Sequence, residues 1–531
     1  MTKKLADEIQ RRRTFAIISH PDAGKTTLTE KLLYHGGAIH EAGEVKGKAT
    51  AKAATSDWMS MEQERGISIT SSVMQYEYRG KHVNLLDTPG HKDFSEDTYR
   101  TLTAADSAVM LIDVAKGVEA QTKKLYEVCR YRHLPIFTFV NKVDREGKVP
   151  LELMDEVEST LKMSCYPITW PIGIGSRFYG LYHRHEKRVY ASKMLNGELH
   201  TEDYAVSDFN DPILDEKVEP DVLAEFREEV ELVDATMENL APEDVLSGKV
   251  SPLTWGSAKY DYGVTNFMDI FESYAPGPVP RKSFGEDLDP CSKDFSGFVF
   301  KVQANMDKRH RDRVAYIRIC SGKFERGMKV KHMRLGREIR LAYSNQFFAD
   351  ERVTLDEAYA GDIVGVNDTG NLRVGDNVTT GKKVAFGAIP RFSPEFFAKI
   401  RLQDMGKKKH LEKALRQFSE EGSIQLFMQP SVGWQDPIIG VVGELQFEVM
   451  LHRMQEEYNI SVKLERTSHS VARWPRTKEG EAYTGEIKGS MLNVVDMYDE
   501  KVVLLEKEWD LNWAERENPD VVFATSIQPT R

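Results

Sequence analysis

The chain has few cysteines and no long apolar run, and these absences exclude several classes of protein. Its four cysteines, Cys129, Cys165, Cys291 and Cys320, lie far apart and include no Cys-x-x-Cys pair. Neither a disulfide framework nor a zinc site is therefore expected. No stretch approaches about 18 unbroken apolar residues, and the charged N-terminus lacks the apolar core of a signal peptide. We expect a cytoplasmic protein without a membrane segment.

The chain also lacks an excess of positive charge. Its net charge of −11 argues against a protein that coats nucleic acid, and we expect no DNA partner. Residues 202–244 hold sixteen Asp and Glu against two basic residues, whereas residues 301–340 hold thirteen Lys and Arg against four acidic residues. This asymmetry suggests separate surfaces for different partners, although charge runs are also typical of plain solvated faces.

The first 145 residues alternate short apolar runs with helical patterns. The runs are residues 15–18, 83–86, 108–112 and 136–140, and each precedes a polar or Gly-containing turn and then a helical stretch. This order predicts a parallel sheet with crossover helices, whose ligands bind at the carboxyl ends of the strands. The acidic, irregular region of about 146–250 is predicted to be an insertion that interrupts the α/β domain, because a further strand-like run, 252–255, follows it.

Three further boundaries follow from composition. A Pro-rich stretch at 275–280 ends the first domain, predicted as 1–280, and residues 281–294 form a linker. Short alternating strands punctuated by Gly predict a β-barrel over 295–390, and mixed helix and strand patterns predict a C-terminal α+β domain over 391–531.

A phosphate-binding pattern follows the first strand. It matches GxxxxGK[ST], with Ser replacing the first Gly. Such a loop turns into a helix N-terminus and points its backbone N–H groups at phosphate oxygens. Lys25 would neutralise the β- and γ-phosphates, and the hydroxyl of Thr26 would bind Mg²⁺. The predicted phosphate-binding residues are Ser19, His20, Pro21, Asp22, Ala23, Gly24, Lys25 and Thr26.

A second phosphate-contacting motif follows the strand at 83–86. A carboxylate at this strand end can hold Mg²⁺ through a water molecule, and Gly90 allows its N–H to approach a γ-phosphate closely. The motif consists of Asp87, Thr88, Pro89, Gly90 and His91. These elements make the first domain a P-loop α/β domain.

A base-reading motif, Asn141-Lys142-Val143-Asp144, follows the strand at 136–140. A carboxylate at Asp144 can accept hydrogen bonds from guanine N1–H and the exocyclic amine, and adenine offers neither. Charge-assisted bonds of about 1.5–3 kcal/mol suffice to select GTP over ATP. Asn141 would brace the loop and the Lys142 stem would lie on the base. Ser257 and Ala258 would close over guanine O6 through a backbone N–H.

In this order the motifs resemble those of translational GTPases. Asp22 lies inside the phosphate loop, residues 64–70 resemble the first switch of ribosomal GTPases, and His91 stands where many other GTPases place Gln. Residues 56–59, 65–75, 91–100, 298–306 and 310–315 are similar to those of the bacterial peptide chain release factor 3 family, a relative of elongation factor G.

This resemblance implies a Mg²⁺-dependent GTP hydrolase stimulated by the ribosome. The metal ligands would be Thr26, Ser68 and, through water, Asp87. Ser68 stands where the family usually has a threonine, and Thr70 is the alternative candidate for this ligand. His91 would orient the attacking water, with Pro21 and Ile67 restraining it until the ribosome draws it in. No arginine finger is evident in cis, so the free protein should hydrolyse GTP slowly.

The resemblance further implies a role in translation termination, in which the factor promotes dissociation of codon-reading release factors after peptide release. The chain would contact ribosomal RNA through the basic segment, with Arg311 and Arg313 as the candidate residues. The acidic segment would contact a ribosomal stalk protein. We expect a monomer.

Three alternatives compete with this interpretation. An elongation-factor-G-type GTPase is the nearest, but such factors carry further C-terminal domains and only about 250 residues follow the linker. A switch that binds GTP without useful catalysis is disfavoured by His91. A peptidyl-tRNA hydrolase is excluded because no Gly-Gly-Gln tripeptide is present, Gly36-Gly37 being followed by Ala38.

Overall fold

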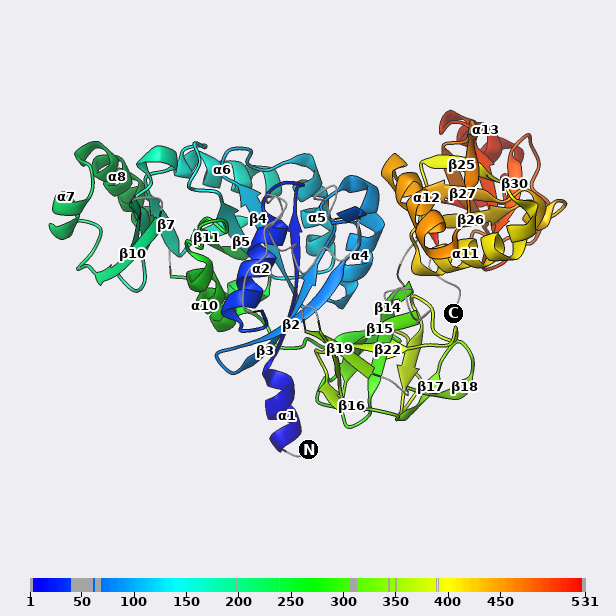
Figure 1. Cartoon of the computed structure of the whole chain (residues 1–531), viewed down its shortest axis with the longest axis horizontal. Helices are drawn as coiled ribbons and strands as arrows, with labels where there is room; N and C mark the ends of the chain where they lie inside the picture. Colours follow the sequence, from blue (N-terminus) through cyan, green and yellow to red (C-terminus); the bar gives the residue numbers. More distant parts are fainter. Residues whose placement is uncertain are drawn as a thin grey trace.

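The computed structural model describes residues 3–39, 61–62, 68–195, 198–237, 239–304, 313–341, 344–348, 351–387, 389 and 391–527. Figure 1 shows an α/β body with an insertion at its far end, a β-barrel beside it and a C-terminal α+β body. This is the predicted fold class. Within the described ranges, no helix combines the length and apolar character needed to cross a bilayer.

A seven-stranded sheet forms the first body, in the order β2-β3-β1-β4-β5-β11-β6. The four apolar runs and the run at 252–255 each fall within a strand, so these predictions are confirmed. The antiparallel edge strand β2 was not predicted. The strands are β1 (Arg12–Ser19), β2 (Ser72–Tyr78), β3 (Lys81–Asp87), β4 (Ser107–Asp113), β5 (Ile136–Asn141), β6 (Ser164–Pro167) and β11 (Val250–Trp255).

Both faces of this sheet are buried, which explains why its strands are continuous apolar runs. Phe15 and Ile17 of β1 pack into one core, whereas Ala16 and Ile18 pack into the other. The first core includes α2 (Lys25–His35) and α10 (Val264–Tyr274); the second includes α4 (Ser95–Ala104), α5 (Ala120–Tyr131) and α6 (Pro150–Leu161).

Strand register brings the ends of the parallel strands to one edge. Ile17 pairs with Asp87, and Asp113 pairs with Asn141. Ser19 pairs with Leu111 of β4. The segments that follow β1, β3, β4 and β5 therefore leave the sheet side by side.

The insertion adds a second, four-stranded antiparallel sheet, in the order β10-β9-β8-β7. Trp170 of β7 packs edge-on against Trp255 of β11, with ring centroids 5.6 Å apart, and so joins the two sheets. The elements are β7 (Thr169–Ile172), η2 (Gly175–Arg177), β8 (Gly180–His183), β9 (Arg188–Leu195), β10 (Glu198–Ala205), α7 (Ile213–Lys217), α8 (Pro220–Thr236) and α9 (Pro242–Leu246).

The barrel is built on an eight-stranded sheet in the order β18-β17-β23-β14-β15-β22-β19-β20. Its core contains Val299, Ile317 and Val364, together with Ile9 from helix α1 (Lys3–Gln10). The strands of this part are β12 (Arg281–Ser283), β13 (Glu286–Leu288), β14 (Ser296–Ala304), β15 (Arg313–Ser321), β16 (Lys323–Glu325), β17 (Lys329–His332), β18 (Arg337–Arg340), β19 (Ser344–Phe348), β20 (Glu351–Thr354), β21 (Glu357–Tyr359), β22 (Ile363–Asn367) and β23 (Asn377–Thr379).

The C-terminal body packs helices on a further eight-stranded sheet, in the order β28-β25-β27-β26-β30-β31-β29-β32. Leu415 of α11 and Phe447 of α12 share a core with Ile400 and Ile439 of the sheet. The elements are β24 (Arg391–Phe392), β25 (Phe396–Leu402), η3 (Met405–Lys407), α11 (Lys408–Glu421), β26 (Gln425–Met428), η4 (Gly433–Gln435), β27 (Ile438–Val441), α12 (Glu444–Tyr458), β28 (Val462–Arg466), β29 (Val471–Arg476), β30 (Leu492–Asp496), β31 (Lys501–Leu505), α13 (Trp509–Glu517), β32 (Val522–Ala524) and β33 (Ser526–Ile527).

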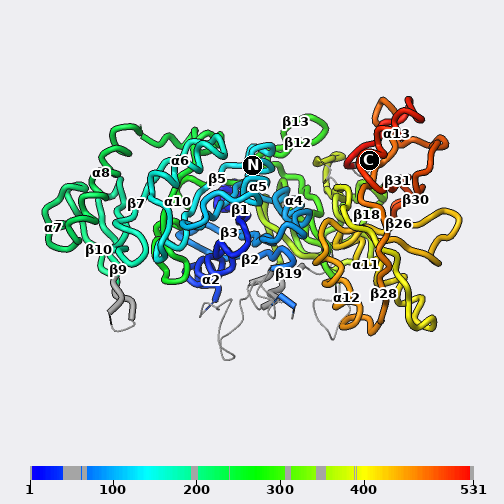
Figure 2. Tube along the Cα trace, turned by 90° about the horizontal axis from the view of Figure 1, so that it is seen from above, coloured from blue at the N-terminus to red at the C-terminus, as the bar shows by residue number. Residues whose placement is uncertain are grey.

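Buried polar contacts join the three bodies. Arg318 of the barrel forms an ion pair with Asp106, which precedes β4, and Thr14 Oγ1 donates to Gly361 O at 2.7 Å. On the other side, Arg100 of α4 donates to the carbonyls of Glu421 and Gly422 at the end of α11, at 3.1 and 3.2 Å. Figures 1 and 2 both show α4 on the side of the first body that faces α11 and α12.

Candidate functional site

The predicted phosphate loop forms a tight turn between β1 and α2. Asp22 and Gly24 have φ values of 64° and 99°, in the left-handed region, and Gly24 is the N-cap of α2. A Cβ at Gly24 would lie 2.3 Å from Asn141 Nδ2. Glycine is therefore required here twice, for its backbone conformation and for the close approach of the neighbouring loop.

Asn141 ties the phosphate loop to both base-reading segments. Its Nδ2 donates to Ala23 O at 2.8 Å, and its Oδ1 accepts from the backbone N–H of Ala258 at 2.9 Å. Val143 N donates to Gly256 O at 3.2 Å. The structure thus brings together the three segments that contain Ala23, Asn141 and Ala258. The sequence alone places these segments in separate loops and does not show that they meet.

Lys142 is held by the end of β4. Its Nζ lies 2.7 Å from Asp113 Oδ2 and donates to Asp22 O at 2.5 Å, so its stem spans from the base-reading motif to the phosphate loop. Burial alone would raise the pKa of Asp113, but Lys142 and the backbone N–H groups of Ala115 and Lys116 outweigh it and lower that pKa. Asp113 was not predicted; its position at the end of a parallel strand was the available signal.

The second phosphate-contacting motif packs against the first. Thr88 Oγ1 donates to Ile17 O at 2.6 Å, which fixes the turn to β1. A Cβ at Gly90 would lie 3.2 Å from Lys25 Nζ and 3.4 Å from Pro21 Cα. The backbone of Gly90 therefore faces the lysine predicted to neutralise phosphate charge. Asp87 is buried at the end of β3.

Two hydroxyl groups converge where the metal is predicted. Thr26 Oγ1 and Ser68 Oγ lie 3.4 Å apart. Thr70 is directed elsewhere, because its N–H and hydroxyl lie 3.0 and 3.4 Å from Glu62 Oε1. Hydroxyl and carboxylate oxygens are suitable ligands for Mg²⁺. The residues present therefore fit this metal, and the geometry favours Ser68 over Thr70.

His91 directly follows Gly90 and caps the short helix η1 (Lys92–Phe94). Its Nδ1 lies 3.3 Å from both Asp93 N and Asp93 Oδ1, and its side chain is 36% exposed. Pro21 lies beside Gly90. Ile67, like residues 56–59 and 64–66, lies outside the described residues, so the restraint of His91 by Ile67 stays a prediction.

Two members of the basic segment are used inside the protein and are not open to RNA. Arg313 forms an ion pair with Glu420 of α11 and donates to Leu372 O at 2.6 Å, and Lys301 is buried. The structure therefore does not support Arg313 as an RNA contact, because its charge is used between the barrel and the C-terminal body. Arg311 lies outside the described residues.

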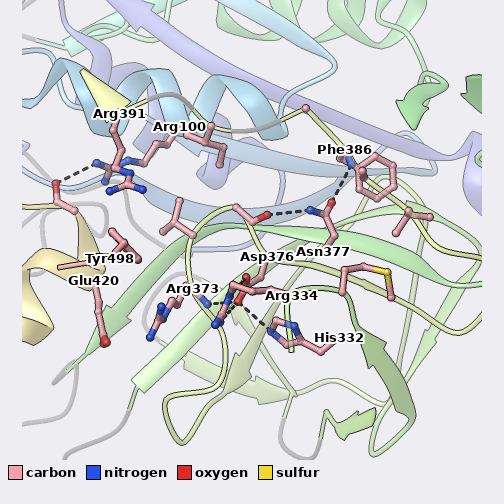
Figure 3. Close-up of a pocket in the computed structure, with 18 of the residues that line it drawn as sticks. Arg100, His332, Arg334, Arg373, Asp376, Asn377, Phe386, Arg391, Glu420 and Tyr498 are labelled. Atoms are coloured by element: carbon pink, nitrogen blue, oxygen red, sulfur yellow. Dashed lines mark hydrogen bonds and ion pairs between the residues drawn. The ribbon is translucent and has the colours of Figure 1, made fainter. Parts of the chain in front are cut away.

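Other members of this segment line a cavity of about 1220 Å³ where the barrel, the C-terminal body and α4 of the first body meet. Figure 3 shows that His332 and Arg334 converge on Asp376, at 3.0 and 2.7 Å. Arg391 stacks on Tyr498, with its guanidinium 4.1 Å from the ring centroid. The cavity contains no residue of the phosphate or guanine motifs, so it is separate from the nucleotide site.

Comparisons with known protein families cover most of the chain. Residues 10–277 match the Elongation factor Tu GTP binding domain, and residues 294–381 match Elongation factor G domain 2. Residues 386–515 match the family described as Class II release factor RF3, C-terminal domain.

Individual relatives match over nearly their whole length. Proteins described as peptide chain release factor 3 are 52% identical in Symbiobacterium thermophilum, covering 99% of both chains, and 50% identical in a Synechocystis species, covering 96% of this chain and 93% of the relative. A solved structure from Thermus thermophilus superposes with a TM-score of 0.69 at 26% identity, covering 88% of this chain and 68% of that one.

Proposed function

Because the chain belongs to the peptide chain release factor 3 family of translational GTPases, we propose that it is a ribosome-stimulated GTPase of translation termination. After peptide release, its GTP-bound form promotes dissociation of codon-reading release factors, and hydrolysis lets the factor leave. Members of this family bind and hydrolyse GTP. The steps on the ribosome are what we propose.

One observation carries the assignment of the nucleotide pocket. Asn141 bonds to both the phosphate loop and the backbone of Ala258, so a guanine ring at Asp144 and a triphosphate at Lys25 are held in one rigid frame. In this frame Asp144 reads the base, Lys142 covers it, and the loop N–H groups with Lys25 bind the phosphates.

Thr26, Ser68 and, through a water molecule, Asp87 would hold Mg²⁺, which supplies positive charge at the phosphates when bound. Phosphoryl transfer to water needs positioning and charge neutralisation more than covalent chemistry. The backbone N–H of Gly90 contacts the γ-phosphate and His91 orients the attacking water. The support for these roles is the packing of Gly90 against Lys25 and the 3.4 Å separation of the Thr26 and Ser68 hydroxyls.

The proposal includes the organisation and partners of the chain. We take 1–280 as the GTP-binding domain with an insertion at about 146–250, 281–294 as the linker, 295–390 as the barrel and 391–531 as the C-terminal domain. A cytoplasmic monomer would meet ribosomal RNA, and a stalk protein would meet the acidic insertion. Exposed carboxylates of α8, among them Glu228 and Glu231, suit a basic partner.

An elongation-factor-G-type ribosomal GTPase is the second candidate. Two matched segments, the GTP-binding domain and the second domain, are shared with elongation factors. The C-terminal match at 386–515 favours the release factor instead.

The decisive experiment is release of a labelled codon-reading factor from post-termination ribosomes. GTP should accelerate release and GDP should not; equal rates with both nucleotides would disprove the termination role. His91→Ala should retain GTP affinity and lose ribosome-stimulated turnover, since stimulation in trans is worth about 10³–10⁵ in other GTPases. His133→Ala, at an exposed histidine distant in sequence, is the matched control.

A further inference from the structure

Asp93 is shared between the predicted catalytic histidine and another body of the protein. It lies in η1, and its side chain is 8% exposed. Its Oδ1 lies 3.3 Å from His91 Nδ1. Its Oδ2 accepts a hydrogen bond of 2.9 Å from the backbone N–H of Leu445, in the first turn of α12. One carboxylate therefore joins His91 to the C-terminal body.

Gly443 makes this contact possible. A Cβ at Gly443 would lie 1.9 Å from Asp93 Cγ and 2.3 Å from Asp93 Oδ2. The backbone of Gly443 is extended, with φ −144° and ψ 155°, which any residue adopts. The glycine is needed for the approach of the carboxylate and not for the backbone conformation.

The start of α12 is arranged to receive a carboxylate. Gln446 Oε1 accepts from the N–H groups of Val442 and Gly443 at 2.8 and 3.1 Å, and the Leu445 N–H goes to Asp93. A negative charge is favourable at this position, because the first turn of a helix carries unsatisfied N–H groups.

An apolar cluster seals the contact. Met61 and Ile69, on either side of the undescribed part of the first switch, pack with Phe94 of η1 and Val449 of α12, and Leu445 packs against this cluster. The position of α12 is therefore coupled to Ile69, next to Ser68, as well as to Asp93.

Two groups compete for Nδ1 of His91. The N–H of Asp93 donates to Nδ1 at 3.3 Å, which leaves the proton on Nε2. Asp93 Oδ1 lies at the same distance as an ion-pair contact, and rotation of the ring toward it would let Nδ1–H donate and leave a lone pair on Nε2. A bond from Nδ1–H to the carboxylate would be charge-assisted, which is the stronger type. A carboxylate at Nδ1 thus sets the tautomer in which Nε2 can accept a proton or hydrogen bond from water.

We propose that Asp93 is a positioning residue that couples the docking of α12 to the tautomer and orientation of His91. The docked α12 holds the carboxylate through the Leu445 N–H, and the carboxylate holds His91. Movement of the C-terminal body away from η1 removes one of these anchors, so the geometry of His91 depends on where that body lies. This inference rests on the proposed role of His91.

Two substitutions test the coupling from opposite sides. Asp93→Asn keeps an acceptor for the Leu445 N–H but presents an amide N–H to His91, which favours the Nε2–H tautomer. Gly443→Ala displaces the carboxylate without changing the GTP-binding domain. Both should lower ribosome-stimulated kcat at least about tenfold while the KM for GTP stays unchanged. Glu444→Gln, at an exposed residue of the same helix turn, is the control and should match the parent.

Nitrogen-15 NMR of histidine-labelled protein supplies a readout independent of turnover, with the His91 resonances identified by their loss in His91→Ala. The parent should show Nδ1 protonated, and Asp93→Asn should show Nε2 protonated.

If His91→Ala is inactive but Asp93→Asn and Gly443→Ala turn over normally, the inference fails and the proposed function stands. A defect in Asp93→Asn alone would exclude α12 and overturn the coupling. A fully active His91→Ala would overturn the role of His91 itself.

Discussion

Lys301 of the barrel donates a hydrogen bond from its Nζ to the carbonyl oxygen of Ser71, three residues after Ser68. Ser71 in turn donates from its N–H and hydroxyl to Asp97 Oδ2, at 2.7 and 2.6 Å. Burial would raise the pKa of Asp97, but Lys301 and Ser71 outweigh burial and keep that pKa below its ordinary value. The buried pair of Lys301 and Ser71, next to the carboxylate of Asp97, thus connects the barrel to the segment that follows the first switch.

Replacing this lysine should loosen the barrel from the GTP-binding domain. Lys301→Met leaves the Ser71 carbonyl without this donor and the charge of Asp97 less compensated, a change that typically costs about 1–3 kcal/mol. Hydrogen exchange should accelerate in β14 and β2 of the variant. Lys331→Met, at an exposed lysine of the same barrel, should leave exchange unchanged. Equal protection in both variants would show that the pair does not hold the interface.

The hydroxyl pair predicts unequal effects at Ser68 and Thr70. Ser68→Ala should weaken GTP binding about tenfold at limiting Mg²⁺, as expected for loss of one polar contact of about 1.5 kcal/mol. Its effect on GDP should be smaller, because only the triphosphate draws the first switch toward the metal. Thr70→Ala should change the Mg²⁺ dependence little, since its hydroxyl faces Glu62. Titration of a fluorescent GTP analogue against Mg²⁺ measures both, and a larger effect at Thr70 would reverse the assignment.

The guanine pocket predicts a change of base preference. Asp144→Asn should lower GTP affinity by roughly 10–100-fold, because two charge-assisted bonds to the base are lost or weakened. Xanthine nucleotides should gain affinity, since an amide N–H can donate to the carbonyl at C2 of xanthine. Competition binding measures the ratio, and Asp155→Asn on the exposed face of α6 is the control. An unchanged GTP to XTP ratio would remove Asp144 from the pocket.

Glu229 of α8 predicts a pH-dependent stability of the insertion. Burial raises its pKa to about 7, although the Trp170 indole N–H, at 2.8 Å, acts in the opposite direction. The folded state therefore keeps a proton that the unfolded state releases near pH 4.5, so this group makes folding less favourable as pH rises from about 4.5 to 7.

Glu229→Gln should remove this dependence. At about pH 8 the variant should be more stable than the parent by on the order of 1–3 kcal/mol, and at about pH 4.5 the two should be equal. The ratio of exchange rates of α8 amides in variant and parent, taken at each pH, measures the difference. A variant that is equally stable at both values would show that Glu229 is ionised in the folded protein.

Much of the fold was predictable because local sequence patterns encode it, and the same patterns gave the predicted nucleotide-binding residues. Apolar runs marked β1, β3, β4, β5 and β11, and the predicted phosphate and guanine residues lie in the turns that follow them. The edge strand β2 was missed, since antiparallel edge strands lack the following turn and helix that marked the others. Asp113 was missed because an Asp at a strand end has no distinctive spacing from its partner Lys142.

The sequence by itself predicted which residues would bind a guanine nucleotide, because glycine, lysine and carboxylate residues at set spacings after a strand are typical of such a site. Only the tertiary structure decided that Ser68 faces Thr26, that Lys301 and Arg313 serve junctions between bodies, and that Asp93 reaches Leu445. The last two residues are separated by 352 positions. Whether such residues meet depends on how whole bodies pack, and no local pattern encodes that arrangement.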